Sequence, residues 1–216
     1  MRSSGRYVVT EPTARSDSRD LGTRAGGHTG ERDPAERHIV LVGLPGVGKT
    51  SVGRRLAKEL QRPFADSDEQ LELRLGRTIP QIFGDDGEEA FRGWETKELE
   101  DLMARPHPLV VAVGGGAVEH PANRTLLRAS AIVVWLRASP AFLATRIDPT
   151  HRPLLATDPE GALQRLTVAR APRYSEVADA VVDIEPFHGL DEQPKHALAR
   201  HIIGLLAKDA AWEAPR

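Results

Sequence analysis

The sequence predicts an α/β fold of three layers, in which helices cover both faces of a central five-stranded parallel sheet. Two observations lead to this prediction. Five short runs rich in Val, Ile and Leu alternate along the chain with amphipathic stretches of helical periodicity. The runs are also almost continuously apolar, which is typical of strands buried on both faces. In such a sheet the ligand binds beyond the carboxyl ends of the strands, so we expect the loops after the five runs to form the site.

Each element is predicted from its local pattern. The strands are expected at 38–43, 63–68, 108–113, 131–137 and 178–184. Helices are expected over 50–60, 68–75, 88–103, 121–127, 140–147, 163–177 and 196–208, with one or two further turns at 79–83. Pro121 stands at a first helical position, where proline is favoured. The helix over 163–177 is expected to continue despite Pro172.

Composition limits the class of protein. The 216 residues carry a net charge of −2, which is not the clustered basic excess of a nucleic-acid binder. There is no cysteine, and no apolar run approaches the roughly 18 residues that span a bilayer. We therefore expect a cytoplasmic protein with no membrane or nucleic-acid partner, and a monomer. Residues 1–37 are expected to be a disordered extension, residues 38–208 a single domain, and residues 209–216 a tail.

The first of the loops reads "GLPGVGKTS" and fits the phosphate-loop pattern G-x-x-x-x-G-K-[ST]. Its backbone N–H groups and the start of the next helix are expected to surround phosphate oxygens. The predicted ATP-binding residues are Gly43, Leu44, Pro45, Gly46, Val47, Gly48, Lys49, Thr50 and Ser51. Lys49 would reach the β- and γ-phosphates, and the Thr50 hydroxyl would bind Mg²⁺. No N-K-x-D element follows, which argues against a GTPase, and the short chain favours a kinase for a small substrate.

Two aspartates follow the second predicted strand. If the extended conformation continues, Asp66 and Asp68 point to the same side. Phosphoryl transfer to an alcohol needs a metal site and a group that orients or deprotonates the hydroxyl, and the pair could divide these roles. The alternative is that both aspartates cap the helix that begins near Glu69.

Three arginines stand near these elements. Arg92 and Arg170 are suited to a carboxylate substrate, because a guanidinium binds a carboxylate through two parallel hydrogen bonds. The segment at about 147–160 is rich in Pro, Thr and Asp, and we expect a mobile lid loop there that closes over nucleotide. Arg152 within it could neutralise charge on the phosphoryl group. Taken singly, each of these arginines is more often an ordinary surface residue. Without the phosphate loop elsewhere in the chain, the segment at about 147–160 would be interpreted as an ordinary surface loop.

The third predicted strand ends in "GGGAV" rather than in an aspartate. If Thr50 and Asp66 form the metal site, this strand needs no carboxylate. Glycine lets a substrate ring approach bare backbone and offers N–H donors. We therefore expect Gly114, Gly115 and Gly116 to form the floor of the acceptor site.

Six segments in order resemble the shikimate kinase family, small ATP-dependent P-loop kinases of the nucleoside-monophosphate-kinase-like group. They are "GLPGVGKTSVGRRLAKEL", "DSD", "GRTIPQIFGDDGEEAFRGWE", "GGGAV", "RPLL" and "RAPRYSEVA", and they span about Ile39 to Ile184. The resemblance implies a kinase domain over 38–208. It also implies Mg²⁺-dependent transfer of the ATP γ-phosphate to the 3-hydroxyl of shikimate, in the pathway to chorismate and the aromatic amino acids.

The resemblance further implies residue roles. Asp68 would contact the ring hydroxyls and act as the base, and Lys49 and Arg152 would stabilise the transferred phosphoryl group. Thr50 would bind Mg²⁺ with help from Asp66. The implied acceptor-binding residues are Asp68, Arg92, Gly114, Gly115, Gly116, Arg170, Phe83, Phe91 and Glu95, and the residues near the adenine are Arg146 and Pro153. From the residues alone, the two phenylalanines would be assigned to the core.

Two alternatives remain open from the sequence. A related kinase could act on another small hydroxy acid, such as gluconate or aminoshikimate, because Arg92 and Arg170 fit any carboxylate. A nucleotide-binding protein without the chemistry is the second alternative. The joint presence of Lys49, Asp68 and Arg152 argues against it, since nucleotide binding alone does not need all three.

Overall fold

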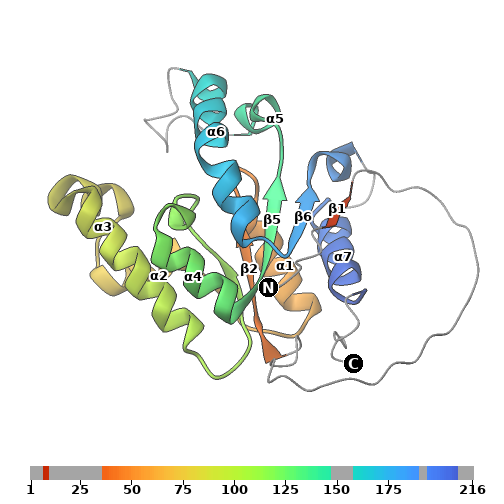
Figure 1. Ribbon diagram of the computed structural model, residues 1–216, viewed down its shortest axis with the longest axis horizontal. Helices are drawn as coiled ribbons and strands as arrows, with labels where there is room; N and C mark the ends of the chain where they lie inside the picture. The colour runs from red at the N-terminus through yellow and green to blue at the C-terminus, as the bar shows by residue number, and fades with distance from the viewer. Residues whose placement is uncertain (1–6, 10–35, 147–157, 190–193, 209–216) are drawn as a thin grey trace, which may run out of the picture.

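The structure, a computed structural model, describes residues 7–9, 36–146, 158–189 and 194–208 (Figure 1). In this part of the chain the sheet has six parallel strands in the order β1-β6-β5-β2-β4-β3. The strands are β1 (Tyr7–Val9), β2 (His38–Val42), β3 (Phe64–Asp66), β4 (Val110–Ala112), β5 (Ala131–Arg137) and β6 (Ala180–Asp183). Strand β2 is central, with Ile39 level with Val110 of β4 on one side and Ile132 of β5 on the other. The predicted five-stranded parallel sheet is confirmed by β2 to β6.

Strand β1 is a sixth strand that the sequence analysis did not predict. Tyr7, Val8 and Val9 pair in parallel with Ala180–Val182 at the outer edge of β6. Residues 1–37 were expected to be disordered, and for Tyr7–Val9 this is wrong. A β-branched and aromatic triplet favours strand pairing, and an uncovered edge strand offers free N–H and C=O groups. Residues 1–6 and 10–35 lie outside the described residues.

Helices cover both faces of the sheet. They are α1 (Lys49–Glu59), α2 (Ser67–Leu75), α3 (Ile79–Met103), α4 (Pro121–Ser130), α5 (Pro140–Ala144), α6 (Pro159–Val177) and α7 (Pro194–Leu206). Helices α1 and α7 pack together on one face, and α4 and α6 lie against the other (Figure 1). Helix α6 continues through Pro172, as predicted.

Two predicted boundaries need correction. Two helical segments were expected at 79–83 and 88–103, and α3 consists of two such segments that meet at a kink at Gly87, where φ is +83° and ψ is 173°, so the first segment is longer than predicted. The predicted lid at 147–160 is too long, because α6 already begins at Pro159. Asp158 caps this helix by accepting a hydrogen bond from the Gly161 N–H, and proline is favoured in the first turn. Residues 147–157 lie outside the described residues.

The apolar core has two parts. The main cluster surrounds β2, β4 and β5, whose inner residues are almost fully buried. A small second cluster of Leu71, Ile82 and Phe91 holds α2 against α3. These two helices extend beyond the edge of the sheet, beside α4 (Figure 1). Among the described helices, none has the length and apolar character to cross a membrane.

Candidate active site

The site begins at the loop between β2 and α1. Gly43 and Gly48 have left-handed backbone angles, with φ of +146° and +92°, which residues with a Cβ rarely adopt. A Cβ on Gly43 would also lie 2.4 Å from the carbonyl oxygen of Leu136. This backbone path therefore requires glycine, as the phosphate-loop pattern predicts.

The start of α1 is open to an anion. Gly48 is its N-cap, and among the described residues no side chain caps this end. The N–H groups there form the positive end of the helix dipole and are suited to phosphate. Lys49 Nζ donates to the carbonyl oxygens of Gly43 and Leu44, at 2.9 and 3.2 Å, and so folds back across the loop. Val47 buries its side chain in the main core, so it can offer a nucleotide only its backbone.

Thr50 and Asp66 meet beside this loop. The Thr50 hydroxyl donates to Asp66 Oδ2 over 2.6 Å. The other oxygen, Oδ1, accepts from the backbone N–H groups of Asp68 and Glu69 and thereby caps α2. One hydroxyl and one carboxylate fit Mg²⁺, which takes few protein ligands beside water and phosphate oxygens. The expectation that Asp66 and Asp68 share one extended segment is wrong, because β3 ends at Asp66 and α2 begins at the next residue.

Two carboxylates lie against the first of the three glycines. A Cβ on Gly114 would lie 2.8 Å from Asp68 Oδ1 and 2.9 Å from Glu95 Oε1. The Gly114 N–H donates to the buried Ser67 hydroxyl at 3.1 Å, which ties the start of α2 to the end of β4. Any larger residue at position 114 would displace these carboxylates.

Glu95 is buried, and its protonation differs from that of an ordinary glutamate. Burial raises the pKa of this carboxyl to about 7, although the nearby Arg92 guanidinium opposes the rise. The Arg92 Nη1 group donates to Glu95 Oε2 over 2.9 Å. Near neutral pH a share of the Glu95 carboxyls is therefore protonated and able to donate a hydrogen bond.

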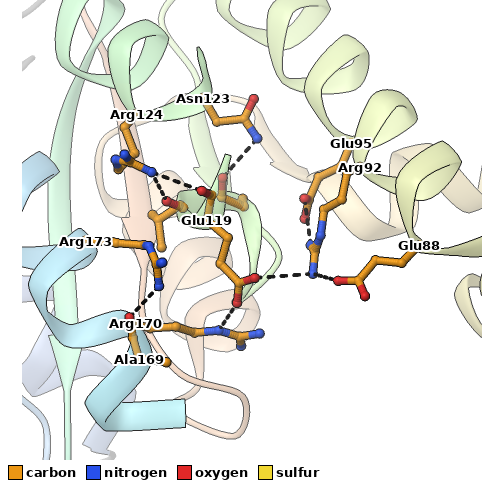
Figure 2. A network of polar contacts seen from close by, with 12 residues as sticks. Glu88, Arg92, Glu95, Glu119, Asn123, Arg124, Ala169, Arg170 and Arg173 are labelled. Carbon is orange, nitrogen blue, oxygen red and sulfur yellow. Dashed lines mark hydrogen bonds and ion pairs between the residues drawn. The ribbon is translucent and has the colours of Figure 1, made fainter. Parts of the chain in front are cut away.

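Arg92 and Arg170 come from different helices, α3 and α6, and converge on Glu119 (Figure 2). Arg170 Nε donates to Glu119 Oε1 over 2.6 Å, and Arg92 Nη2 lies 3.9 Å from Glu119 Oε2. Both arginine side chains are largely buried, with exposed fractions of 19% for Arg92 and 12% for Arg170. A Cβ on Gly116 would lie 2.6 Å from Arg92 Nη1. The two cations therefore lie together above the triple glycine.

Gly115 connects these two halves of the site. A Cβ there would lie 3.2 Å from Pro45 Cδ and 3.4 Å from the Gly43 carbonyl oxygen, both in the phosphate loop. Its carbonyl oxygen accepts a hydrogen bond of 2.6 Å from the hydroxyl of the buried Tyr174. Burial raises the pKa of this tyrosine hydroxyl, so it remains a donor. The triple glycine thus lies between the phosphate loop and the arginine pair.

A cavity of about 570 Å³ lies beside Leu44 of the phosphate loop. It is also lined by the end of β5 and the chain that follows, by the end of β6 and by α6. Arg146 lies nearby in the chain but is exposed, with its guanidinium over the Phe142 ring at 5.3 Å and Nη1 3.0 Å from His188 Nδ1. Arg152 and Pro153, also assigned to the nucleotide, lie outside the described residues.

Comparison with known proteins decides the family. A family model described as shikimate kinase matches residues 45–203. The chain belongs to the shikimate kinase family. A shikimate kinase from Burkholderia lata is 48% identical over 155 residues, which cover 70% of this chain and 83% of that protein. One from Cupriavidus pinatubonensis is 49% identical over 149 residues, which cover 68% and 77%. The chain is accordingly a kinase of aromatic amino acid biosynthesis.

Solved structures agree with the family. A shikimate kinase from Acinetobacter baumannii in complex with shikimate superposes with a TM-score of 0.73 and 38% identity, covering 82% of this chain and 96% of that one. A gluconokinase from Sinorhizobium meliloti has a TM-score of 0.50 at 24% identity, covering 84% and 95%. The second likeness shows only a shared fold. The predicted family and fold class are therefore confirmed.

The structure brings most of the predicted site residues together, and it adds three residues that the sequence analysis did not name. Phe91 belongs to the small core under α2 and α3, and Phe83 stacks on it with ring centroids 4.2 Å apart. Ser67, Glu119 and Tyr174 were not predicted. Tyr174 could have been found, because it lies four residues after Arg170 and thus on the same helix face.

Proposed function

We propose that the chain transfers the γ-phosphoryl group of Mg²⁺-bound ATP to the 3-hydroxyl of shikimate at the triple glycine. The observation that carries the proposal is the place of Gly115. A Cβ on it would lie 3.4 Å from the phosphate-loop oxygen of Gly43 and 3.5 Å from Arg170 Nη1. One glycine therefore lies within reach of both a phosphate site and a carboxylate site, as direct transfer between two bound substrates needs.

The phosphate loop binds ATP in this proposal. The open start of α1 and Lys49 hold the phosphates. Thr50 and Asp66 would hold Mg²⁺, which would supply positive charge beside the phosphate oxygens. The cavity beside Leu44 is the space for the base. The family resemblance assigns Arg152 to the transferring phosphoryl group, and Arg146 and Pro153 to the adenine.

The second half of the site binds the acceptor. Arg92 and Arg170 hold the carboxylate, because guanidinium groups bind carboxylates through paired N–H donors. The carboxyl groups of Asp68 and Glu95 form hydrogen bonds with the ring hydroxyls, beside the backbone of Gly114. Phe83 and Phe91 support Arg92, whose guanidinium lies over the Phe91 ring at 5.3 Å.

The proposed reaction is an in-line displacement. The oxygen of the 3-hydroxyl attacks the γ-phosphorus, and the bond from this phosphorus to the β–γ bridging oxygen breaks. ADP leaves with the electron pair of that bond, and Asp68 accepts the hydroxyl proton. Lys49 and Arg152 stabilise the charge that develops on the phosphoryl oxygens.

A coupled ADP-release assay tests the acceptor. We expect release with shikimate and none above background with gluconate or without acceptor. Release with gluconate alone would overturn the assignment. Asp68→Asn should leave ATP binding largely intact and lower kcat by about 10²- to 10⁴-fold, since it removes the base. Near-normal turnover of this variant would remove Asp68 from the catalytic role.

A further inference from the structure

Glu119 lies where two cations of the acceptor site meet. It ends the short 3-10 turn Ala117–Glu119 that follows the triple glycine. Its carboxylate accepts from Arg170 Nε at 2.6 Å and forms an ion pair with Arg92 Nη2 at 3.9 Å (Figure 2). It is thus a carboxylate of the protein itself in contact with both arginines that are proposed to bind the carboxylate of the acceptor.

The backbone of Glu119 is firmly held. Its N–H donates to the Gly116 carbonyl oxygen at 2.8 Å, and its own carbonyl oxygen accepts from Arg124 Nη1 at 3.0 Å. Arg124 also donates to the Val118 carbonyl oxygen and pairs with Glu176 of α6 at 2.8 Å. These contacts hold the backbone of the turn, whereas the side chain of Glu119 is bound through its carboxylate alone.

The Glu119 side chain can move away from the arginines towards solvent. The Glu119 side chain is 32% exposed, whereas the Arg170 side chain is only 12% exposed. The carboxylate can therefore rotate towards water, where it is readily solvated. Arg92 keeps ion pairs with Glu95 and Glu88 of its own helix, which do not depend on Glu119.

The charges make simultaneous binding of two carboxylates unfavourable. A guanidinium binds a carboxylate best through two parallel N–H groups, and Glu119 takes the Nε group of Arg170. Glu95, Glu88 and Glu119 already surround Arg92. A further carboxylate between the two arginines would lie beside that of Glu119, and like charges at such distances repel in a half-buried site.

We propose that Glu119 is a positioning residue that holds Arg92 and Arg170 in place while the acceptor site is empty. The carboxylate of the incoming acid must displace the Glu119 carboxylate from the two arginines. The inference rests on the proposed role of the two arginines. The competition lowers the affinity for the acid and also favours release of the product, which keeps the same carboxylate. The affinity for an acceptor without that charge is set by other contacts.

Calorimetric titration of the full chain with shikimate and with shikimate methyl ester separates charge competition from a structural effect. Glu119→Gln keeps the shape and an oxygen acceptor for Arg170 but removes the charge. We expect this variant to bind shikimate about three- to tenfold more tightly, the size expected for a half-exposed charge-assisted contact. Its affinity for the ester should stay within about twofold of the unsubstituted protein.

Glu88→Gln is the matched control. Glu88 also pairs with Arg92, at 3.2 Å, but its side chain is 66% exposed and it does not reach Arg170. The same loss of charge there should leave both affinities within about twofold, because exposed ion pairs contribute little. Tighter binding by both variants would show a general charge effect and would overturn the inference.

The other outcomes are also decisive. Unchanged or weaker binding of shikimate by Glu119→Gln would overturn the inference, as would equal tightening for the acid and the ester. Arg170→Ala tests the underlying assignment and should weaken shikimate binding more than about tenfold. If Arg170→Ala binds shikimate normally, the role of this arginine in the proposed function fails, and the inference about Glu119 fails with it.

Discussion

Gly116→Ala should weaken acceptor binding without destabilising the protein. Gly116 has φ of −93° and ψ of −7°, which alanine adopts without strain. Its new Cβ would lie 2.6 Å from Arg92 Nη1 and 2.9 Å from Nη2, so the guanidinium must move. The end of a long side chain moves at little cost, but Arg92 then no longer faces the carboxylate of the acceptor. A hydrogen bond to a charged group contributes about 1.5–3 kcal/mol, which predicts a rise of roughly ten- to hundredfold in the KM for shikimate.

The assay is steady-state ADP release with each substrate varied in turn, together with thermal unfolding. The KM for ATP should change by less than about twofold, and the melting temperature should not fall. Gly93→Ala is the control, because Gly93 is an exposed glycine of α3 beside Arg92 with nothing within 4 Å of an added Cβ. It should stabilise the protein by about 0.5–1 kcal/mol and leave both KM values unchanged. An unchanged KM for shikimate in Gly116→Ala would refute the reasoning.

Three further predictions use the same assays. Gly114→Ala should lower kcat at least tenfold with a smaller effect on KM for ATP, because its Cβ displaces the Asp68 carboxylate; unchanged kcat would contradict this. Thr50→Val should raise the Mg²⁺ concentration needed for half-maximal rate, and an unchanged requirement would remove Thr50 from the metal site. Glu95→Gln should gain stability relative to the unsubstituted protein as the pH rises from 5 to 8.5, by up to about 3 kcal/mol. The folded-state pKa of Glu95, about 7, lies above the ordinary 4.5, so the stability that the neutral carboxyl contributes is lost as the pH rises through 7. Denaturant unfolding measures this, and a difference between the two proteins that does not depend on pH would contradict the raised pKa.

The backbone path of the phosphate loop could be predicted from the sequence. Gly43, Gly48, Lys49 and Thr50 lie within eight consecutive residues, so local spacing determines their geometry. The fold was predictable for a related reason. Apolar strand runs that alternate with amphipathic helices allow few arrangements other than a covered parallel sheet, and the carboxyl ends of its strands lie along one edge.

The acceptor side could be predicted only as a set of residue types. Asp68, Glu95 and Arg170 come from three helices, and no spacing in the sequence determines which carboxylate meets which guanidinium. Glu119 illustrates the difficulty. A glutamate after "GGGAV" resembles any surface glutamate, and its role depends on Arg170 of α6, 51 residues away. Strand β1 was missed for a similar reason, since its partner β6 lies at the far end of the chain.

Each of the three glycines after β4 leaves room for a different neighbouring group. At Gly114 the missing Cβ leaves room for the carboxylates of Asp68 and Glu95, and at Gly116 it leaves room for the Arg92 guanidinium. At Gly115 it leaves room for the phosphate loop at Pro45. The sequence analysis explained these glycines by the approach of a substrate ring to bare backbone. The structure adds that the protein's own groups already need this space, so a substitution at each position should impair a different function: proton transfer at 114, the junction with the phosphate loop at 115, and recognition of the acid at 116.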